Sequence, residues 1–575
     1  MRFVAFATDY DETLADEGVA TERTQAALEK VRASGRRLLL VTGRELPDLR
    51  KVFPRVGELF DAVVAENGAV LWLPKTKEEL LLAEPPPPTL YQALQKRGCK
   101  PLSAGKVIVS TREPHEKEVL EEIRDQALPL QVIFNKGAVM VLPTGVSKGT
   151  GLKAALLALG LSPRNCVACG DAENDHTFLA ESELGVAVQN ALPNLKERAD
   201  AVTKHPAGRG VVELLEALLL DDLEVVAAGS TRRWVRLGHD EEGREVKLPP
   251  SGDRLLFAGP SGAGKSTAAK GFLERLIENG YQCCILDPEG DYDEFPGTLR
   301  LGDGQRPPTI DEVMSALEQP DQQVVVNLLG VKLADRPAFF AALLPRIQEL
   351  RGRTGRPHWV VIDEAHHLVP ASWTPAPVTL SKRLEGVMMV TMVPADVQAD
   401  LLRDVDQIVT VGDKAQSTIT NFCKAVGIPA PTGKVGPVEQ GYVLLWRRGQ
   451  PAPQRVKIEA AKADHRRHVR KYAQGELAPD RSFWFRGPEG KMNLRAQNLT
   501  LFSQMAAGVD DETWLHHLGK GDYSTWFRDF VKDEELAEQA EIVEQDDDLD
   551  AQESRQKILK EIDRRYTLGS GAQAG

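Results

Sequence analysis

Short apolar runs alternate with amphipathic stretches over residues 1 to about 222. The run "RFVAFAT" is followed by the helix-like stretch "TERTQAALEKVRASG" and then by a second apolar run, "RRLLLVTGR". This alternation predicts β-α-β units that build a parallel sheet. A second alternating block extends from Arg254 to about residue 450 and predicts another doubly wound α/β sheet.

The remaining chain has a different pattern. A basic, helix-like stretch, "ADHRRHVRKYAQGEL", precedes a Trp-rich segment, the acidic run "EIVEQDDDLDAQE" and a short amphipathic helix. We therefore expect three parts: an α/β domain over 1–222, a second α/β domain over 223–475, and a helical module over 476–575. Its tail is acidic, and its last residues are expected to be disordered.

Composition narrows the class of protein. The chain has 575 residues with 42% hydrophobic content, enough for several buried cores. Its net charge of -13 gives no indication of DNA binding, and its six cysteines lack framework spacing, which is typical of a reducing compartment. No apolar run approaches the roughly 18 residues of a membrane helix. We expect a cytoplasmic protein without a membrane partner.

Candidate chemistry begins at the end of the first predicted strand. Asp9 and Asp11 stand there, where parallel sheets bind ligands, although two aspartates at such a place are often a turn or a helix cap. Further polar groups end later strands or begin a helix. They are Thr42 in "LLLVTGR", Lys148 in "GVSKGTGL", and Gly170, Asp171, Asn174 and Asp175 in "CVACGDAENDHTF".

In this order, the four segments resemble the haloacid dehalogenase superfamily of phosphohydrolases. The resemblance implies that Asp9 is a nucleophile that forms an aspartyl-phosphate, and that Asp11 protonates the leaving oxygen and later activates water. Thr42 and Lys148 would hold the phosphoryl oxygens.

The same resemblance implies a Mg²⁺ site. Asp171, Asp9 and the backbone carbonyl of Asp11 would bind the ion, while Asp175 would support the metal side or orient Lys148. Carboxylates this close repel one another unless a divalent cation and a lysine neutralise them.

Two features refine the resemblance. Glu12 follows Asp11 where the family usually has glycine, which puts the loop geometry or leaving-group access in doubt. An α+β insertion at about 75–145 looks like the C2-type cap of subfamily IIB, or Cof-like, enzymes. Such a cap implies a small phosphorylated metabolite, of the sugar phosphate or phosphoglycolate class, as the substrate.

The second domain opens with a phosphate-binding motif. "GPSGAGKST" fits G-x-x-x-x-G-K-[ST] between an apolar run and a helical pattern, the context that a P-loop requires. Its backbone amides would cradle the phosphates of ATP, with Lys265 on the β- and γ-oxygens and Ser266 on Mg²⁺. The nucleotide-binding candidates are Gly259, Gly262, Gly264, Lys265, Ser266 and Thr267.

A partner strand, "HWVVIDEAHHL", places Asp363 for Mg²⁺ and Glu364 for polarising an attacking water, which favours hydrolysis over a kinase reaction. "ILDPEGDY", with Asp287, Glu289 and Asp291, resembles the acidic segment of the HerA/FtsK group of hexameric DNA-translocating ATPases, although a helix cap and turn is the alternative. The resemblance implies a homo-oligomeric ring with an arginine finger.

The chain departs from that group in two features, and a third, the identity of the arginine finger, is undecided. Thr391-Met392 stands where the group commonly has a glutamine sensor, and residues 223–254 are too few for the amino-terminal barrel of HerA. The arginine-finger candidates are Arg346, Arg351, Arg353 and Arg356.

The carboxyl-terminal segment resembles a small helical module that is appended to uncharacterised prokaryotic proteins. Trp514 and Trp526 are interpreted as its core rather than as a base-stacking platform. The adjacent His516 and His517 do not form a metal site on one helix face. The basic stretch before the module is either a solvated helix face or a nucleic-acid contact.

The leading hypothesis is a Mg²⁺-dependent phosphatase fused to an ATP-hydrolysing HerA/FtsK-type domain. One alternative is an ATP-driven DNA-processing or defence factor with a nucleic-acid end phosphatase. Another is a regulatory ATPase whose first domain senses a metabolite, which an intact Asp9 and Asp11 argue against.

Overall fold

The computed structural model describes residues 1–260, 262–293, 295–373, 385–459, 461, 482–490, 492–531, 533–546 and 548–566. The chain divides into two compact units. The first comprises Met1–Gly259, Phe272–Asp293 and Gly297–Lys457, and the second comprises Pro260–Gly271, Glu294–Pro296 and Ile458–Gly575.

The first sheet has eight strands in the order β12-β11-β10-β1-β2-β3-β4-β5. Strands β12 to β3 in this order are parallel, and β4 and β5 extend the sheet as an antiparallel edge. The strands are β1 (Ala5–Thr8), β2 (Arg37–Val41), β3 (Ala62–Ala65), β4 (Val70–Leu73), β5 (Glu78–Leu81), β10 (Cys166–Gly170), β11 (Leu184–Ala187) and β12 (Ala201–Val202). The predicted parallel α/β sheet is confirmed.

Helices cover this sheet, and local sequence sets where they begin. Helix α1 (Glu22–Ala33) starts after Thr21, whose hydroxyl accepts the N–H of Thr24, and α6 (Lys148–Ala158) starts at a capping box. The remaining helices of this layer include α2 (Leu46–Val52), α3 (Val56–Leu59), α7 (His176–Glu181), α8 (Pro193–Arg198) and α9 (Ala207–Asp221). These caps satisfy backbone N–H groups that a helix leaves open at its start.

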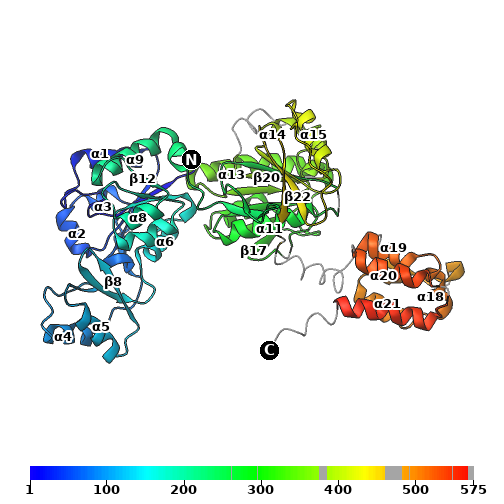
Figure 1. Ribbon diagram of the computed structural model, residues 1–575, viewed down its shortest axis with the longest axis horizontal. Helices are drawn as coiled ribbons and strands as arrows, with labels where there is room; N and C mark the ends of the chain where they lie inside the picture. Colours follow the sequence, from blue (N-terminus) through cyan, green and yellow to red (C-terminus); the bar gives the residue numbers. More distant parts are fainter. Residues whose placement is uncertain are drawn as a thin grey trace. The chain divides into compact units, whose positions relative to one another are not determined.

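The predicted α+β cap is a separate small layer with its own core. Its sheet has the order β6-β7-β9-β8, with β6 (Ser103–Ala104), β7 (Val109–Arg112), β8 (Leu130–Asn135) and β9 (Ala138–Pro143). Two helices, α4 (Pro88–Lys96) and α5 (Glu116–Asp125), pack on it, and Figure 1 shows them with β8 at the lower left. Helix α4 is an element that the sequence pattern did not single out.

The second sheet has eleven strands in the order β14-β13-β23-β22-β21-β15-β20-β19-β16-β18-β17. Its parallel part runs from β21 to β17. These strands are β15 (Arg254–Ala258), β16 (Cys283–Asp287), β17 (Thr298–Leu301), β18 (Gln323–Asn327), β19 (Trp359–Ile362), β20 (Val387–Thr391) and β21 (Gln407–Thr410). Its helices include α11 (Lys265–Glu278), α12 (Ile310–Leu317), α13 (Arg336–Thr354), α14 (Ala399–Arg403) and α15 (Ala415–Val426).

The segment before Arg254 adds strands to this sheet instead of forming a barrel. Strands β13 (Val235–His239) and β14 (Glu245–Leu248) pair antiparallel at its edge, next to β22 (Tyr442–Arg447) and β23 (Gln454–Ile458).

Both sheets belong to the first unit and share polar contacts. The hydroxyl of Tyr281 donates to Glu183 Oε2 at 2.7 Å, and His358 Nε2 lies 2.9 Å from Asn165 Oδ1. Glu183 and Asn165 directly precede strands β11 and β10 of the first sheet. Tyr281 and His358 precede strands β16 and β19 of the second sheet, so the contacts join the amino-terminal ends of strands from the two sheets.

The carboxyl-terminal module combines a two-stranded sheet with a helical core. Its elements include β24 (Phe483–Phe485), β25 (Leu494–Ala496), α17 (Leu499–Ala506), α18 (Asp511–Leu518), α19 (Asp522–Trp526), α20 (Glu534–Glu544) and α21 (Ala551–Tyr566). The acidic run spans the end of α20 and the start of α21, and α21 buries Ile558 and Ile562, so most of the expected tail is packed helix. The final residues, 567–575, and the basic stretch lie outside the described residues.

Trp514 and Trp526 lie in the core of this module, as predicted. The Trp514 indole N–H donates to Ser554 Oγ at 3.0 Å, and its ring stacks on Tyr523. No helix in the part of the chain that the structure describes combines the length and apolarity of a membrane span.

Candidate active site

Three parallel strands bring the predicted residues of the first domain together. Asp9 follows β1, Thr42 follows β2 and Asp171 follows β10, and these strands are neighbours in the order β10-β1-β2. Because they are parallel and in register, their carboxyl ends share one edge of the sheet. Loop residues after these strands therefore converge on one place.

Lys148 joins two of the carboxylates. Its ammonium lies 2.8 Å from Asp9 Oδ1 and 2.6 Å from Asp175 Oδ1, and its side chain is buried. Burial alone would lower the pKa of Lys148, but the charges of Asp175 and Asp9 outweigh it and raise the pKa above its usual value. Lys148 therefore stays positively charged inside the protein.

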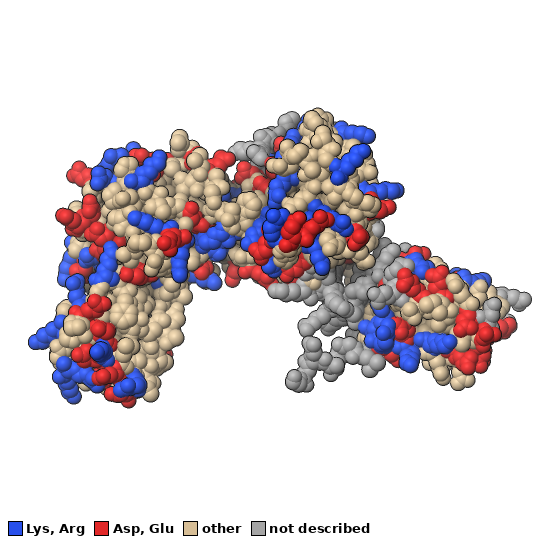
Figure 2. Space-filling model, viewed as in Figure 1, with Lys and Arg blue, Asp and Glu red and all other residues tan. Residues whose placement is uncertain are grey.

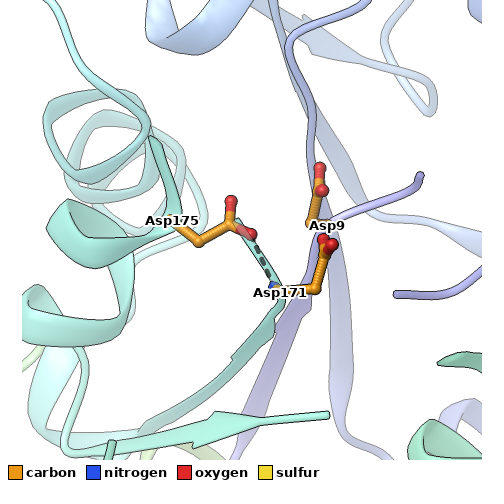
Figure 3. Close-up of side chains that lie close together, drawn as sticks. All are labelled: Asp9, Asp171 and Asp175. Atoms are coloured by element: carbon orange, nitrogen blue, oxygen red, sulfur yellow. Dashed lines mark hydrogen bonds between the residues drawn. The ribbon is translucent and has the colours of Figure 1, made fainter. Parts of the chain in front are cut away.

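Asp9, Asp171 and Asp175 form a compact acidic group at this edge. Each offers a carboxylate oxygen, and these oxygens lie within 4.8 Å of one another. Figure 3 shows the Asp9 and Asp171 carboxylates close together, with Asp175 bonded to the backbone of Asp171. Asp175 Oδ2 accepts the N–H groups of Asp171 and Ala172 at 2.8 and 2.9 Å. With its other oxygen on Lys148, Asp175 is placed to orient the lysine and the loop.

The residues present fit a divalent cation. Burial raises the pKa of Asp9 well above its usual value, with repulsion from Asp175 and Asp171 adding to the effect. Burial and the neighbouring Asp175 also raise the pKa of Asp171. Three ionised aspartates carry three negative charges, and Lys148 and Lys136 supply two positive ones. Carboxylate oxygens are also the ligands that Mg²⁺ prefers.

Asp11 is paired with an arginine that the sequence interpretation passed over. Arg44 Nε and Nη2 each lie 2.8 Å from an oxygen of Asp11, and Arg44 Nη1 lies 2.6 Å from Asp48. Hydrogen bonds to Asp11 are the main cause of the raised pKa of Arg44. Arg44 stands two residues after Thr42 in the same "VTGR" run, and this proximity was the available signal.

Two further loop residues complete the mouth of the site. Thr42 is buried, and its hydroxyl accepts the N–H of Arg44 at 3.2 Å. Glu12 has φ 56°, the left-handed conformation that favours glycine. Glu12 therefore adopts the backbone conformation that a glycine would adopt at this position, so the substitution does not change the loop's backbone geometry.

The cap contributes a cation that the sequence interpretation also missed. Lys136, at the tip of the β8–β9 hairpin, places its ammonium 2.5 Å from Asp171 Oδ2. Thr13 donates to the other oxygen, Asp171 Oδ1, at 2.9 Å. A pattern-based prediction could place Lys136 in a turn but not against a residue of another layer.

A carboxylate of the core also anchors the cap. Glu66, after β3, accepts the N–H groups of Lys106, Val107 and Ile108 at 2.8, 2.7 and 3.0 Å. A Cβ at Gly105 would lie 2.6 Å from this carboxylate. Glycine is therefore required for the close approach of the cap's first hairpin.

The second candidate site begins at β15. Gly259, Gly262 and Gly264 all have positive φ, at 152°, 77° and 93°. A Cβ at Gly259 would lie 2.5 Å from Val411 Cγ2, so only glycine fits. Lys265, Ser266 and Thr267 form the first turn of α11. This strand, turn and helix are the local structure that the P-loop motif predicts.

Asp363 and Glu364 follow β19, two places from β15 in the sheet order, and these strands are parallel through β20. Both residues are largely buried, and Glu364 has φ 40°. Glu364 Oε2 lies 3.5 Å from His366 Nδ1, and Thr391 Oγ1 lies 3.4 Å from the same nitrogen. His366 thus lies between the predicted catalytic carboxylate and Thr391, the residue predicted to replace the glutamine sensor.

The acidic segment after β16 contains a turn held by Asp287. Its buried carboxylate accepts the N–H groups of Glu289, Asp291 and Tyr292 at 3.2, 3.0 and 2.7 Å. The alternative interpretation of this segment, a turn, therefore applies to Asp287, whose carboxylate stabilises the turn.

The arginine candidates fall into two groups. Arg351 is bonded to backbone carbonyls, including Pro357 O at 2.7 Å, and the buried Arg356 donates to Gly160 O at 2.8 Å. Arg346 and Arg353 are more exposed and pair with Asp311 and Glu318. The geometry favours the exposed pair for any contact with another subunit.

In the carboxyl-terminal module, His517 has polar neighbours at both ring nitrogens. Nδ1 lies 2.7 Å from Asp522 Oδ2, and Nε2 accepts the backbone N–H of Arg486 at 2.9 Å.

Two protein families match separate parts of this chain. A family described as haloacid dehalogenase-like hydrolase matches residues 6–98 and 95–215. A second family, described as the central domain of helicase HerA, matches residues 254–333. Both resemblances drawn from the motifs are confirmed.

Similar proteins include two archaeal phosphatases. Phosphoglycolate phosphatase 2 of Saccharolobus solfataricus is 31% identical over 226 residues, which cover 38% of this chain and 92% of that protein. Phosphoglycolate phosphatase of Sulfurisphaera tokodaii is 32% identical over 222 residues, which cover 37% and 93%. A solved haloacid dehalogenase-like hydrolase from Bacteroides thetaiotaomicron is 18% identical with a TM-score of 0.33, covering 38% of this chain and 99% of that one.

Proposed function

Because the chain belongs to the haloacid dehalogenase-like hydrolases, we propose that its first domain is a Mg²⁺-dependent phosphatase that acts through an aspartyl-phosphate on a small phosphorylated metabolite. One observation carries the proposal. Lys148 bridges Asp9 and Asp175 at a strand edge where Asp171 completes an acidic group. In this proposal the group supplies a nucleophile (Asp9), a fixed cation (Lys148) and ligands for a metal ion within one small volume.

Asp9 and Asp11 divide the chemistry. An oxygen of Asp9 attacks phosphorus, and the bond to the ester oxygen breaks as Asp11 gives that oxygen a proton. Asp11 then takes a proton from water, which attacks the phosphorus and releases Asp9. Arg44 holds both oxygens of Asp11 in the ionised form, which is the form that takes the proton from water.

The remaining residues hold charge and position. Lys148 and the hydroxyl of Thr42 would bind the phosphoryl oxygens, and Asp175 would keep Lys148 in place. Mg²⁺, when held by Asp9, Asp171 and the Asp11 carbonyl, supplies positive charge that offsets the charge of the phosphoryl oxygens.

The cap and the similar proteins support a small substrate. A sheet with two helices covers the site, and the similar archaeal proteins are phosphoglycolate phosphatases. We therefore place the substrate in the sugar phosphate or phosphoglycolate class. A covering layer of this kind excludes water during attack.

For the second domain we propose ATP hydrolysis. Lys265 would contact the β- and γ-phosphates, Ser266 and Asp363 would hold Mg²⁺, and Glu364 would polarise the attacking water. Ring assembly and DNA translocation remain predictions. On the visible face in Figure 2, basic and acidic side chains are interspersed, which does not favour the DNA-processing alternative over a metabolite phosphatase.

Phosphate release by the full-length protein tests the first activity. With Mg²⁺, the protein should hydrolyse at least one of a panel of sugar phosphates and phosphoglycolate. Asp9→Asn should abolish this activity, whereas Asp125→Asn, an exposed carboxylate on α5, should keep it. Turnover of no panel member, or activity that survives Asp9→Asn, would refute the proposal.

Lys265→Ala separates the two activities. The variant should lose ATP hydrolysis and keep phosphate-ester hydrolysis, because the lysine lies in the other sheet's P-loop. Stimulation of ATP hydrolysis by double-stranded DNA would support the motor hypothesis, and insensitivity to any polymer would support a regulatory role.

A further inference from the structure

The hairpin that carries Lys136 is a two-residue turn. Strands β8 and β9 pair up to Asn135 and Ala138, so that only Lys136 and Gly137 connect them. Their φ values are 46° and 81°. A hairpin turn with two positive φ values prefers asparagine or aspartate before glycine, so lysine is a costly residue at this position.

The Lys136 side chain crosses from the cap to the core. Its ammonium lies 2.5 Å from Asp171 Oδ2, which is buried at the end of β10, while the Lys136 side chain is 44% exposed. One end of the interaction is thus fixed in the core, and the other is partly exposed to solvent. Arg44, by contrast, is held by both Asp11 and Asp48.

A count of charges indicates how the pairing of Lys136 would change if a divalent cation were bound by the three aspartates. Asp9, Asp171 and Asp175 carry three negative charges when ionised. Lys148 supplies one positive charge and a divalent cation would supply two, so the charges of these five partners would balance. With a cation bound, Asp171 would no longer need Lys136 as its counter-charge, and the ammonium of Lys136 would be available to another anion.

We propose that Lys136 is a specificity-determining residue that binds a carboxylate of the substrate, separate from the phosphoryl group. This inference rests on the proposed phosphatase function. Lys136 contacts Asp171, whose oxygen lies within 4.8 Å of an Asp9 oxygen, so its ammonium is close to the nucleophile. The preferred substrate is therefore a short phosphate monoester in which one or two carbons separate the carboxylate from the ester oxygen.

A pair of substrates tests this assignment in the full-length protein at saturating Mg²⁺. 2-Phosphoglycolate carries the carboxylate, and 2-hydroxyethyl phosphate replaces it with a neutral hydroxymethyl group. In Lys136→Met, the kcat/KM ratio of the first substrate over the second should fall roughly tenfold, mainly through KM, which corresponds to one charge-assisted contact. Lys136→Arg should restore most of the ratio, and Lys96→Met, on an exposed position of α4, should not change it.

A binding measurement gives a readout without turnover. In Asp9→Asn with Mg²⁺, calorimetric titration with 2-phosphoglycolate should show roughly tenfold weaker affinity when Lys136→Met is added. Equal affinities with and without Lys136→Met, or a selectivity ratio equal to that of the wild type, would overturn the assignment of Lys136. Hydrolysis of both esters would in that case still support the phosphatase function. Hydrolysis of no phosphate monoester would overturn both.

Discussion

Arg44 grips Asp11 at two points, with Nε and Nη2 each 2.8 Å from a carboxylate oxygen. The planar guanidinium fixes the direction of the carboxylate as well as its position. This matters for the proposed mechanism, because Asp11 is only partly buried and would have to deliver a proton along one direction.

Arg44→Lys should therefore lower kcat about tenfold to a hundredfold with a smaller change in KM, since a misplaced catalytic group costs this much. Steady-state phosphate release measures it. Arg55→Lys is the matched control, because Arg55 also pairs with two carboxylates, those of Glu29 and Glu58, but lies on the surface away from the site. A kcat equal to that of the wild type would show that Asp11 needs no such support.

Lys148→Met should remove phosphatase activity and also destabilise the first domain. The change leaves two buried carboxylates without their cation, which typically costs about 3–5 kcal/mol. Chemical denaturation would measure the loss. Lys153→Met, an exposed position on the same helix, should change neither property, and a Lys148→Met protein of unchanged stability would contradict the buried bridge.

Mg²⁺ should stabilise the protein more at neutral than at acid pH. Burial raises the pKa of Asp9 and Asp171, so protons compete with the ion over a range that extends above the ordinary carboxylate pKa. Without the ion, ionisation of these two groups lowers stability as the pH rises through their unfolded-state pKa, and the ion reverses this effect. The increase in Tm on adding Mg²⁺ should be larger at about pH 8 than at about pH 5. An equal increase at both values, or a larger one in acid, would exclude Asp9 and Asp171 as the ligands.

Glu12→Gly should stabilise the first domain by about 1 kcal/mol, because Glu12 has φ 56° and glycine removes the cost of a left-handed side-chain residue. Glu22→Gly, in the first turn of α1, should have the opposite sign, since glycine disfavours a helix. Denaturation midpoints of the two variants would compare them. A destabilised Glu12→Gly protein would mean that the glutamate side chain stabilises this loop.

The sequence by itself determined which residues stand at strand ends. Asp9, Thr42 and Asp171 follow apolar runs, and the carboxyl ends of parallel strands share an edge, so their convergence follows from local pattern and topology. The glycines of the P-loop likewise follow from a local requirement, the positive φ angles of the loop backbone. Such features depend on residues within one strand, turn or helix start.

Tertiary structure alone decided the partners of these residues. Lys136 reaches Asp171 only because the cap packs against the core, and residues 35 apart in sequence have no local pattern that joins them. Arg356 was a candidate for another subunit, but it is buried against backbone carbonyls of its own chain. Side-chain partners across layers depend on how separate elements pack, and the periodicity of one element does not contain that information.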